Sequence, residues 1–110
     1  MLTATKRPVY RYVIVEAAEV DARSLESKLV AAVMRLGGIL GLAEVELTIV
    51  HVCADKRLAV IRVKRGGLVL FRAALAAHKE PLVRVIKVAG TLRKARAICT
   101  SLCRRGTVPS

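Results

Sequence analysis

The 110-residue sequence contains no asparagine, no glutamine and no tryptophan. Asparagine and glutamine side chains are chemically unstable at high temperature, so their absence is typical of proteins from hot-growing organisms. Arginine outnumbers lysine by 13 to 7, which is a weaker sign in the same direction. We therefore expect a thermophilic source.

Long apolar runs are also missing. No segment approaches the roughly 20 apolar residues that a membrane-spanning helix needs, and the first residues lack the layout of a secretion signal. The three cysteines, Cys53, Cys99 and Cys103, are an odd set, which argues against a secreted disulfide framework. A single intracellular bridge stays possible in a hyperthermophile. We expect a cytoplasmic protein with no membrane partner.

Acidic residues are scarce, and their distribution is uneven. Residues 1–50 contain six basic and six acidic residues, whereas residues 51–110 contain 14 basic and two acidic ones. The net charge of +12 therefore lies entirely in the second half. Solubility alone does not require one sign of charge in one half of a chain. This asymmetry predicts a polyanionic partner, above all a nucleic acid.

Catalytic patterns are absent. His51 and His78 have no nucleophile arranged beside them in the sequence, and the glycine pairs match no phosphate-binding loop. An acylphosphatase needs an arginine and an asparagine, and the chain has no asparagine. We expect no catalytic residues and no cofactor bound by the protein.

One metal site is conceivable. His51 and Cys53 share one side of a predicted strand, and Cys99 and Cys103 share one face of a predicted helix. Together they make the four nitrogen and sulfur ligands of a structural zinc site. Neither pair has the common C-x-x-C spacing, and buried free cysteines are more common. We therefore expect no metal.

Periodicity predicts seven elements. Asp21 or Ser24 is positioned to cap the first helix, and Gly37-Gly38 are typical of its end. An arm (1–8) and a tail (106–110) flank a single domain (9–105). The predicted strands are 9–16, 45–52, 58–64 and 82–89, and the predicted helices are 25–36, 68–78 and a third that starts at Gly90-Thr91.

This order, β-α-β-β-α-β followed by a helix, predicts an α+β, ferredoxin-like split βαβ sandwich. Two helices would cover one face of a four-stranded antiparallel sheet. Strands one and three are apolar on both sides, so the other face needs a cover as well. The third helix can supply part of it, and we expect a protein partner at the rest. The predicted partner interface comprises Tyr10, Tyr12, Ile14, Leu58 and Val60.

Two basic clusters adjoin glycines at element ends. The first lies at the end of strand three and the second opens the last helix, where backbone N–H groups favour anions. With no aromatic residue in strand three, we expect contacts to RNA shape and backbone rather than to stacked bases. The predicted RNA-binding residues are Arg62, Lys64, Arg65, Gly66, Gly67, Arg93, Lys94 and Arg96.

Four segments resemble the archaeal ribonuclease P protein component 2 family, a relative of the eukaryotic Pop-five subunit. The segments are Tyr10-Arg11-Tyr12, Gly41-Leu42-Ala43-Glu44, Ile61-Arg62-x-x-Arg65-Gly66-Gly67-Leu68, and Val88-Ala89-Gly90-Thr91-Leu92-Arg93-Lys94-Ala95. The resemblance implies a ferredoxin-like fold and pairing with ribonuclease P protein component 3, with a possible second copy in a heterotetramer. It also implies that ribonuclease P RNA, with magnesium, removes the 5′ leader of precursor tRNA. A general RNA-binding or ribosomal module is the alternative.

Overall fold

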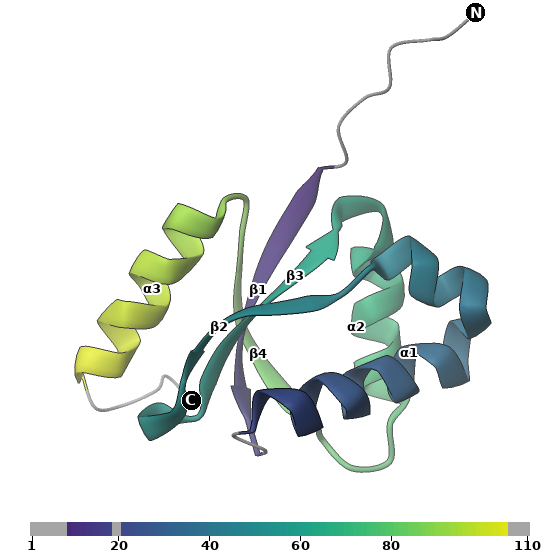
Figure 1. Cartoon of the computed structure of the whole chain (residues 1–110), viewed down its shortest axis with the longest axis horizontal. Helices are drawn as coiled ribbons and strands as arrows, with labels where there is room; N and C mark the ends of the chain where they lie inside the picture. Colours follow the sequence, from purple (N-terminus) through teal and green to yellow (C-terminus); the bar gives the residue numbers. More distant parts are fainter. Residues whose placement is uncertain (1–8, 19–20, 106–110) are drawn as a thin grey trace, which may run out of the picture.

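The computed structural model describes residues 9–18 and 21–105, so the predicted arm and tail lie outside the described residues. The chain forms a four-stranded sheet with helices on both sides (Figure 1). None of the described helices is long and apolar enough to cross a membrane. In chain order the elements are β1 (Tyr10–Ala17), α1 (Ala22–Val45), β2 (Thr48–Cys53), β3 (Leu58–Lys64), α2 (Leu68–Ala77), β4 (Val83–Ala89) and α3 (Leu92–Arg105), with 3₁₀ turns at Ala54–Lys56 and Arg65–Gly67.

The sheet has the strand order β2-β3-β1-β4, and every neighbouring pair is antiparallel. β1 therefore lies between β3 and β4, as the split βαβ pattern requires. Tyr10 pairs with Lys64 at one end of the β1–β3 ladder, and Glu16 pairs with Leu58 at the other. The predicted ferredoxin-like fold is confirmed.

One face of the sheet packs on α1 and α2. Val13 and Val15 of β1 and Ile61 of β3 point to this side, where they meet helical residues such as Leu29 and Phe71. All five of these side chains have no solvent exposure. This is the larger of the two cores, because both crossover helices deliver apolar stripes to it.

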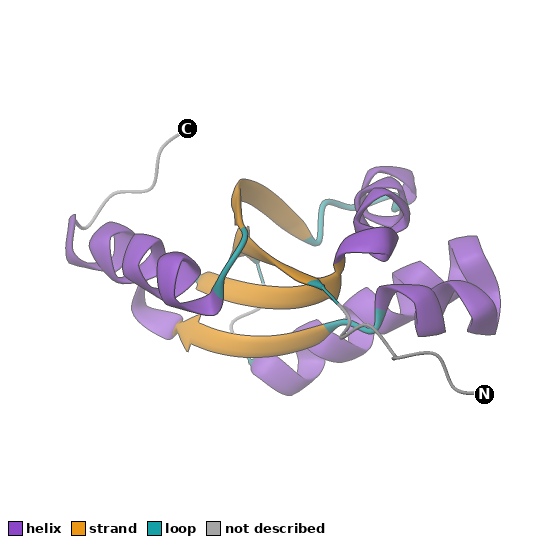
Figure 2. Ribbon diagram, turned by 90° about the horizontal axis from the view of Figure 1, so that it is seen from above, coloured by secondary structure: helices purple, strands orange, loops and turns teal. Residues whose placement is uncertain are grey.

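α3 covers the opposite face (Figure 2). Ala95, Cys99 and Leu102 recur at helical spacing and pack against Ile14 and Val60 of the sheet. The prediction that both faces need a cover is confirmed, and the chain itself supplies the second cover.

The end of α1 differs from the prediction. Gly38 takes a backbone conformation that is not helical, with φ 66° and ψ −165°, but it kinks the helix instead of ending it. A further helical segment follows and runs to Val45, which the sequence placed in a strand. Val45 is fully buried in the α1–α2 core, so tertiary packing outweighs the local alternation that predicted a strand there.

The start of α1 follows the sequence. Asp21 is the N-cap, and its carboxylate accepts hydrogen bonds from the backbone N–H of Ser24 at 3.2 Å and from the Ser24 hydroxyl at 2.9 Å. These hydrogen bonds hold the pKa of Asp21 below its ordinary value. Of the two candidate caps, the structure selects Asp21.

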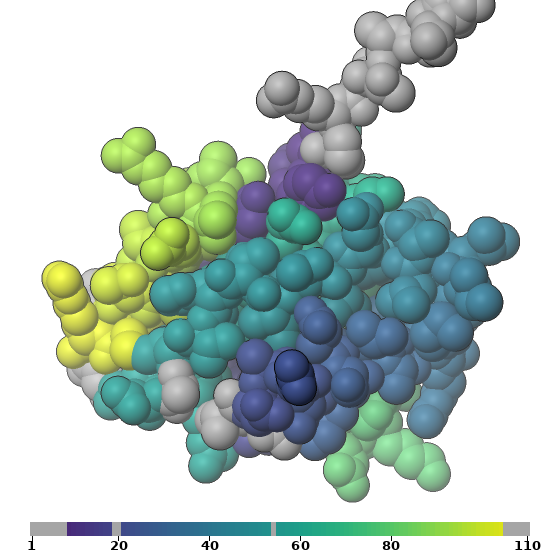
Figure 3. Space-filling model, in the orientation of Figure 1, coloured from purple at the N-terminus to yellow at the C-terminus, as the bar shows by residue number. Residues whose placement is uncertain are grey.

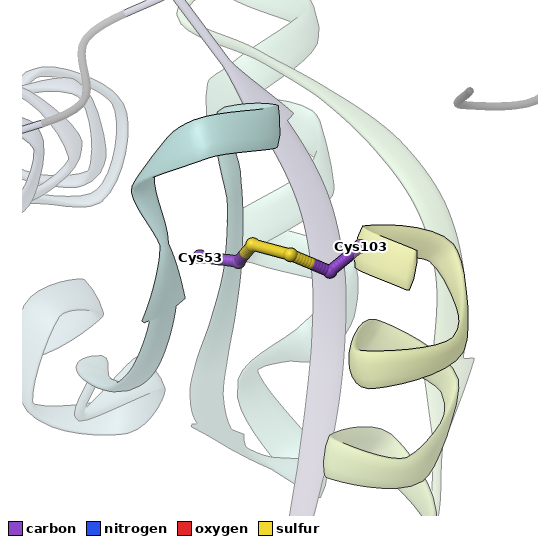
Figure 4. Close-up of a disulfide and its surroundings, with 2 residues drawn as sticks. All are labelled: Cys53 and Cys103. Atoms are coloured by element: carbon purple, nitrogen blue, oxygen red, sulfur yellow. A yellow bond between two sulfur atoms is a disulfide. The ribbon is translucent and has the colours of Figure 1, made fainter. Parts of the chain in front are cut away.

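Cys53 and Cys103 form a disulfide that joins the end of β2 to the last turns of α3 (Figure 4). The alternative of a zinc site is therefore wrong, because two of its four ligands are bonded to each other. Cys99 is buried as a free thiol, and burial raises its pKa, so it stays protonated.

Candidate functional site

The two predicted basic clusters lie at the same end of the sheet. β3 and β4 each pair antiparallel with β1, so these two strands run in the same direction and end together. Lys64 of β3 faces Tyr10 of β1, and Ala89 of β4 faces Tyr12. Only β1 separates the clusters, which corresponds to roughly 10 Å between strands two positions apart. In Figure 1 this end holds the tips of β1 and β3 and the start of α3.

The cluster at the end of β3 is partly engaged in contacts within the chain. The guanidinium of Arg62 lies over the ring of Tyr10, 4.5 Å from its centroid, as in a cation–π contact. The Arg62 Nε is buried and has no hydrogen-bond partner in the described part of the chain. Arg62 is thus oriented by Tyr10, and it retains an unsatisfied donor.

Lys64 of this cluster is paired with an acid. Its Nζ lies 2.9 Å from the carboxylate of Glu46, the residue that caps the C-terminus of α1. Glu46 holds the pKa of Lys64 above its ordinary value, and Lys64 holds the pKa of Glu46 below its own. Because this pair is exposed to solvent, it reduces the local positive charge and orients Lys64 without adding much stability.

The glycines that follow serve two different purposes. A Cβ on Gly66 would meet nothing within 4 Å, so its backbone is open to approach. A Cβ on Gly67 would lie 2.6 Å from the backbone of Glu44 and Val45. Gly67 is buried, and the chain uses it to pack the turn against the end of α1. The backbone N–H of Arg65 donates to the carbonyl of Val9 at 2.8 Å, which ties the turn to the start of β1.

The cluster that opens α3 is more accessible. The Thr91 hydroxyl accepts a hydrogen bond from the backbone N–H of Lys94 at 3.2 Å, which is an N-cap arrangement. Arg93, Lys94 and Arg96 are exposed and form no ion pair in the described residues. Three cations in the first turns oppose the positive end of the helix dipole. This local cost is relieved when an anion binds, so the arrangement favours a phosphate.

The predicted partner interface is covered in part. Ile14, Leu58 and Val60 are at most 1% exposed beneath α3. Tyr10 and Tyr12 stay half-buried. Of the five predicted residues, a partner on this face can therefore reach only the two tyrosines, and its presence there stays a prediction.

Exposed apolar side chains lie instead where α1 and α2 cross. Ile39 is 73% exposed, Leu40 85% and Val69 81%. The side chain of Leu70 packs close to Gly37 and Gly41 at this crossing, which brings the kinked end of α1 onto α2. The sequence pattern did not predict this surface, because Gly37-Gly38 indicated the end of the helix. We call Leu36, Ile39, Leu40 and Val69 the crossing surface.

The two histidines lie in no metal-binding cluster of the described residues. The His78 Nδ1 lies 2.7 Å from the backbone carbonyl of Glu80, a local turn contact. Across the described ranges, no three His, Cys, Asp or Glu side chains gather as a metal site requires.

The sequence model of the Rpp14/Pop5 family matches residues 10–100. A chain of the yeast ribonuclease MRP structure, solved by cryo-electron microscopy, has a similar fold: the TM-score is 0.55 at 19% identity, over 93% of this chain and 94% of that one. At this identity the structural likeness shows the fold alone. No individual curated protein matches the chain.

Proposed function

The chain belongs to the Rpp14/Pop5 family, and from that premise we propose that it is an RNA-binding protein subunit of ribonuclease P. It would support the catalytic RNA in removing the 5′ leader of precursor tRNA. The observation that carries this proposal is the convergence of two basic clusters, 62–65 and 93–96, at one end of the sheet.

The physical role follows from the charges. Arg65, Arg93, Lys94 and Arg96 are exposed and have no acidic partner in the described residues. They would neutralise RNA phosphates and release counterions, which stabilises a compact RNA. The RNA and its magnesium ions perform the cleavage, and the protein supplies no catalytic group and holds no cofactor. The proposed RNA-binding residues are those predicted from the sequence, and Gly67 contributes through packing.

The crossing surface is our proposed position for a protein partner. Exposed apolar groups rimmed by polar residues mark protein–protein interfaces, and the two helices that carry this surface, α1 and α2, lie across the sheet from α3 (Figure 2). Ribonuclease P protein component 3 is the partner that we propose, with a second copy of the chain in a heterotetramer as an extension. Val69 follows the turn Arg65–Gly67 in the chain, so the protein partner would lie next to the first basic cluster and across the sheet from α3.

We also propose an archaeal, hot-growing source and a cytoplasmic location. The lack of asparagine and glutamine supports the first. The disulfide is compatible with the second, because intracellular disulfides are common in hyperthermophiles.

A double substitution tests the RNA contact. In Arg93→Ala with Lys94→Ala, both changes are at exposed positions, so we expect the fold to be retained. Affinity for ribonuclease P RNA should fall about tenfold or more, and the slope of log K against log salt should become shallower by about 1.5, since two phosphate contacts are lost. Titration at several salt concentrations measures both quantities.

The matched control removes the same charge elsewhere. Arg35 on α1 and Arg72 on α2 are exposed on the other side of the sheet, and Arg35→Ala with Arg72→Ala should weaken binding much less. Equal losses in the two variants would mean that net charge, not this site, attracts RNA. A general RNA-binding module would bind an unrelated structured RNA of equal length as tightly, which separates the alternative function.

A further inference from the structure

The outward face of α3 carries a shallow hollow that the two basic clusters do not explain. It is lined by Arg96, Ala97, Thr100, Ser101 and Arg104. Arg96, Thr100 and Arg104 follow each other at intervals of four residues, so they stand in a row along one side of the helix. We call these five residues the α3 strip.

The polar side chains of the α3 strip can all donate hydrogen bonds. The strip offers two guanidinium groups at its ends and two hydroxyl groups between them, and no acidic residue lines it. Arginine and the Ser/Thr hydroxyls are side chains that donate hydrogen bonds to phosphate oxygens. Ala97 is the one apolar residue of the strip, whereas the core of a protein interface is usually rich in large apolar and aromatic groups.

The α3 strip is also long enough to contact RNA at more than one point. From Arg96 to Arg104 the helix rises about 12 Å, at 1.5 Å per residue, so the strip can contact more than one phosphate of a strand. α3 contains five basic residues and no acidic one. The strip shares Arg96 with the second basic cluster and extends that cluster along the helix to Arg104.

We propose that the α3 strip is a second RNA contact, which binds the sugar–phosphate backbone of one strand while the end of the sheet binds another part of the same RNA. The inference rests on the proposed function, because it names a further contact of the same RNA. An acidic protein segment is the competing occupant, and the test below separates the two.

The disulfide fixes the strip in place. α3 is connected to β4 at its first residues and bonded to β2 through Cys103 near its last ones. Arg104 directly follows the bonded cysteine, so one end of the strip is anchored by a covalent link (Figures 1 and 4). A helix that is held at both ends presents the row of donors with little loss of freedom on binding.

The test compares two variants with the same loss of charge. Arg96→Ala with Arg104→Ala should lower affinity for ribonuclease P RNA about tenfold and flatten its salt dependence, while Arg35→Ala with Arg72→Ala should not. A second variant, Thr100→Val with Ser101→Ala, keeps every charge. It should lower affinity by a smaller factor, about twofold to fivefold, without changing the salt slope.

A photo-crosslinking amino acid gives an independent readout. Placed at Ser101 it should crosslink to the RNA, and placed at Ala73, an exposed position on α2, it should not. Normal binding by both strip variants, while Arg93→Ala with Lys94→Ala still loses affinity, would overturn this inference and leave the proposed function standing. Crosslinking from Ser101 to a component 3 subunit, and not to RNA, would also overturn it. Failure of the wild-type chain to bind RNA at all would overturn the proposed function itself.

Discussion

The two faces of the sheet are built differently. Among the described residues, the core under α1 and α2 contains 13 buried side chains, including Phe71 and Leu29, whereas the core under α3 contains seven, of which α3 contributes an alanine, a cysteine and a leucine. The first face is held mainly by apolar contact. The second adds a disulfide to a thinner core. We conclude that the first face stabilises the fold and the second presents the charged surface.

The surface charges follow the same division. α3 contains five basic residues and no acidic residue, whereas α1 contains three basic and two acidic residues. A helix whose charges repel one another and oppose its dipole gains little from its own sequence. Its position on the sheet therefore depends on the few buried side chains and the covalent bond. The space-filling view shows α3 at one side of the molecule, away from the part formed by α1 (Figure 3).

Truncating a core side chain on each face gives the largest expected effect. Phe71→Ala should lower the free energy of unfolding by about 3–5 kcal/mol, because it removes a fully buried ring from the larger core. Leu102→Ala, at a 7% exposed position under α3, should cost about 2 kcal/mol, near the lower limit for such changes. Chemical denaturation measures both values. Equal losses in the free energy of unfolding would contradict the difference between the larger core under α1 and α2 and the smaller core under α3.

Removing the disulfide is the next largest change. Cys53 and Cys103 are 50 residues apart, and closing a loop of that size restricts the unfolded chain. Cys53→Ser with Cys103→Ser should therefore lower the free energy of unfolding by about 2–4 kcal/mol. Wild-type protein under reducing conditions should behave like this variant, while Cys99 should resist alkylation in the folded state because it is buried. Unchanged stability would mean that apolar packing alone holds α3.

Two adjacent glycines in the turn after β3 should respond differently to the same substitution. Gly67→Ala should destabilise by about 1–3 kcal/mol, since its Cβ would meet the backbone at the end of α1. Gly66→Ala has open space and should be close to neutral. Thermal unfolding of the two variants measures the difference. If Gly66→Ala weakens RNA binding while it leaves the melting temperature unchanged, backbone access at this turn matters for the RNA.

The smallest expected effect concerns the Glu46–Lys64 pair. The lowered pKa of Glu46 means that its contribution is present above the ordinary carboxyl pKa of 4.5 and is lost as pH falls through the lowered value. The raised pKa of Lys64 means that its contribution is present below 10.5 and is lost as pH rises through the raised value. Glu46→Gln should thus be slightly less stable than wild type near neutral pH and equal to it at strongly acid pH. A pH series of melting temperatures checks this, and a gap that persists in acid would contradict it.

Glu46→Gln also tests the division of charge. Within the described residues, removing the acid that pairs with Lys64 leaves this lysine without an ion pair. RNA affinity should therefore rise, by about twofold, because an exposed pair has a modest energy. A loss of affinity would show that Glu46 serves to position Lys64 rather than to reduce its charge.

The strand order and both crossovers followed from local patterns, because β-branched runs, glycine breaks and helical stripes each act over a few residues. The kink at Gly38 did not follow. A glycine pair is typical of a helix end, and only the packing of Val45 in the core explains why helix resumes. Long-range contacts of this kind leave no local signal.

The candidate site was predictable in part. The basic residues around Arg65 and Arg93 were identifiable from the sequence, but their meeting at one end of the sheet depends on β1 pairing with both β3 and β4. The contact of Arg62 with Tyr10 and the role of Gly67 depend on the same register. The disulfide joins residues 50 apart, and spacing alone left it open. The α3 strip has a signal in the sequence, since Arg96, Thr100 and Arg104 are spaced at intervals of four residues.

Cleavage of precursor tRNA by ribonuclease P RNA from the same source, at limiting magnesium, tests the central claim most directly. The reaction is measured with the RNA alone, with component 3, with this protein, and with both. We predict that cleavage at the 5′ leader appears with both proteins and falls when Arg93→Ala with Lys94→Ala replaces the wild type, but not when Arg35→Ala with Arg72→Ala does. No stimulation by the wild-type pair, despite tight binding to the RNA, would contradict the account and favour a general RNA-binding module.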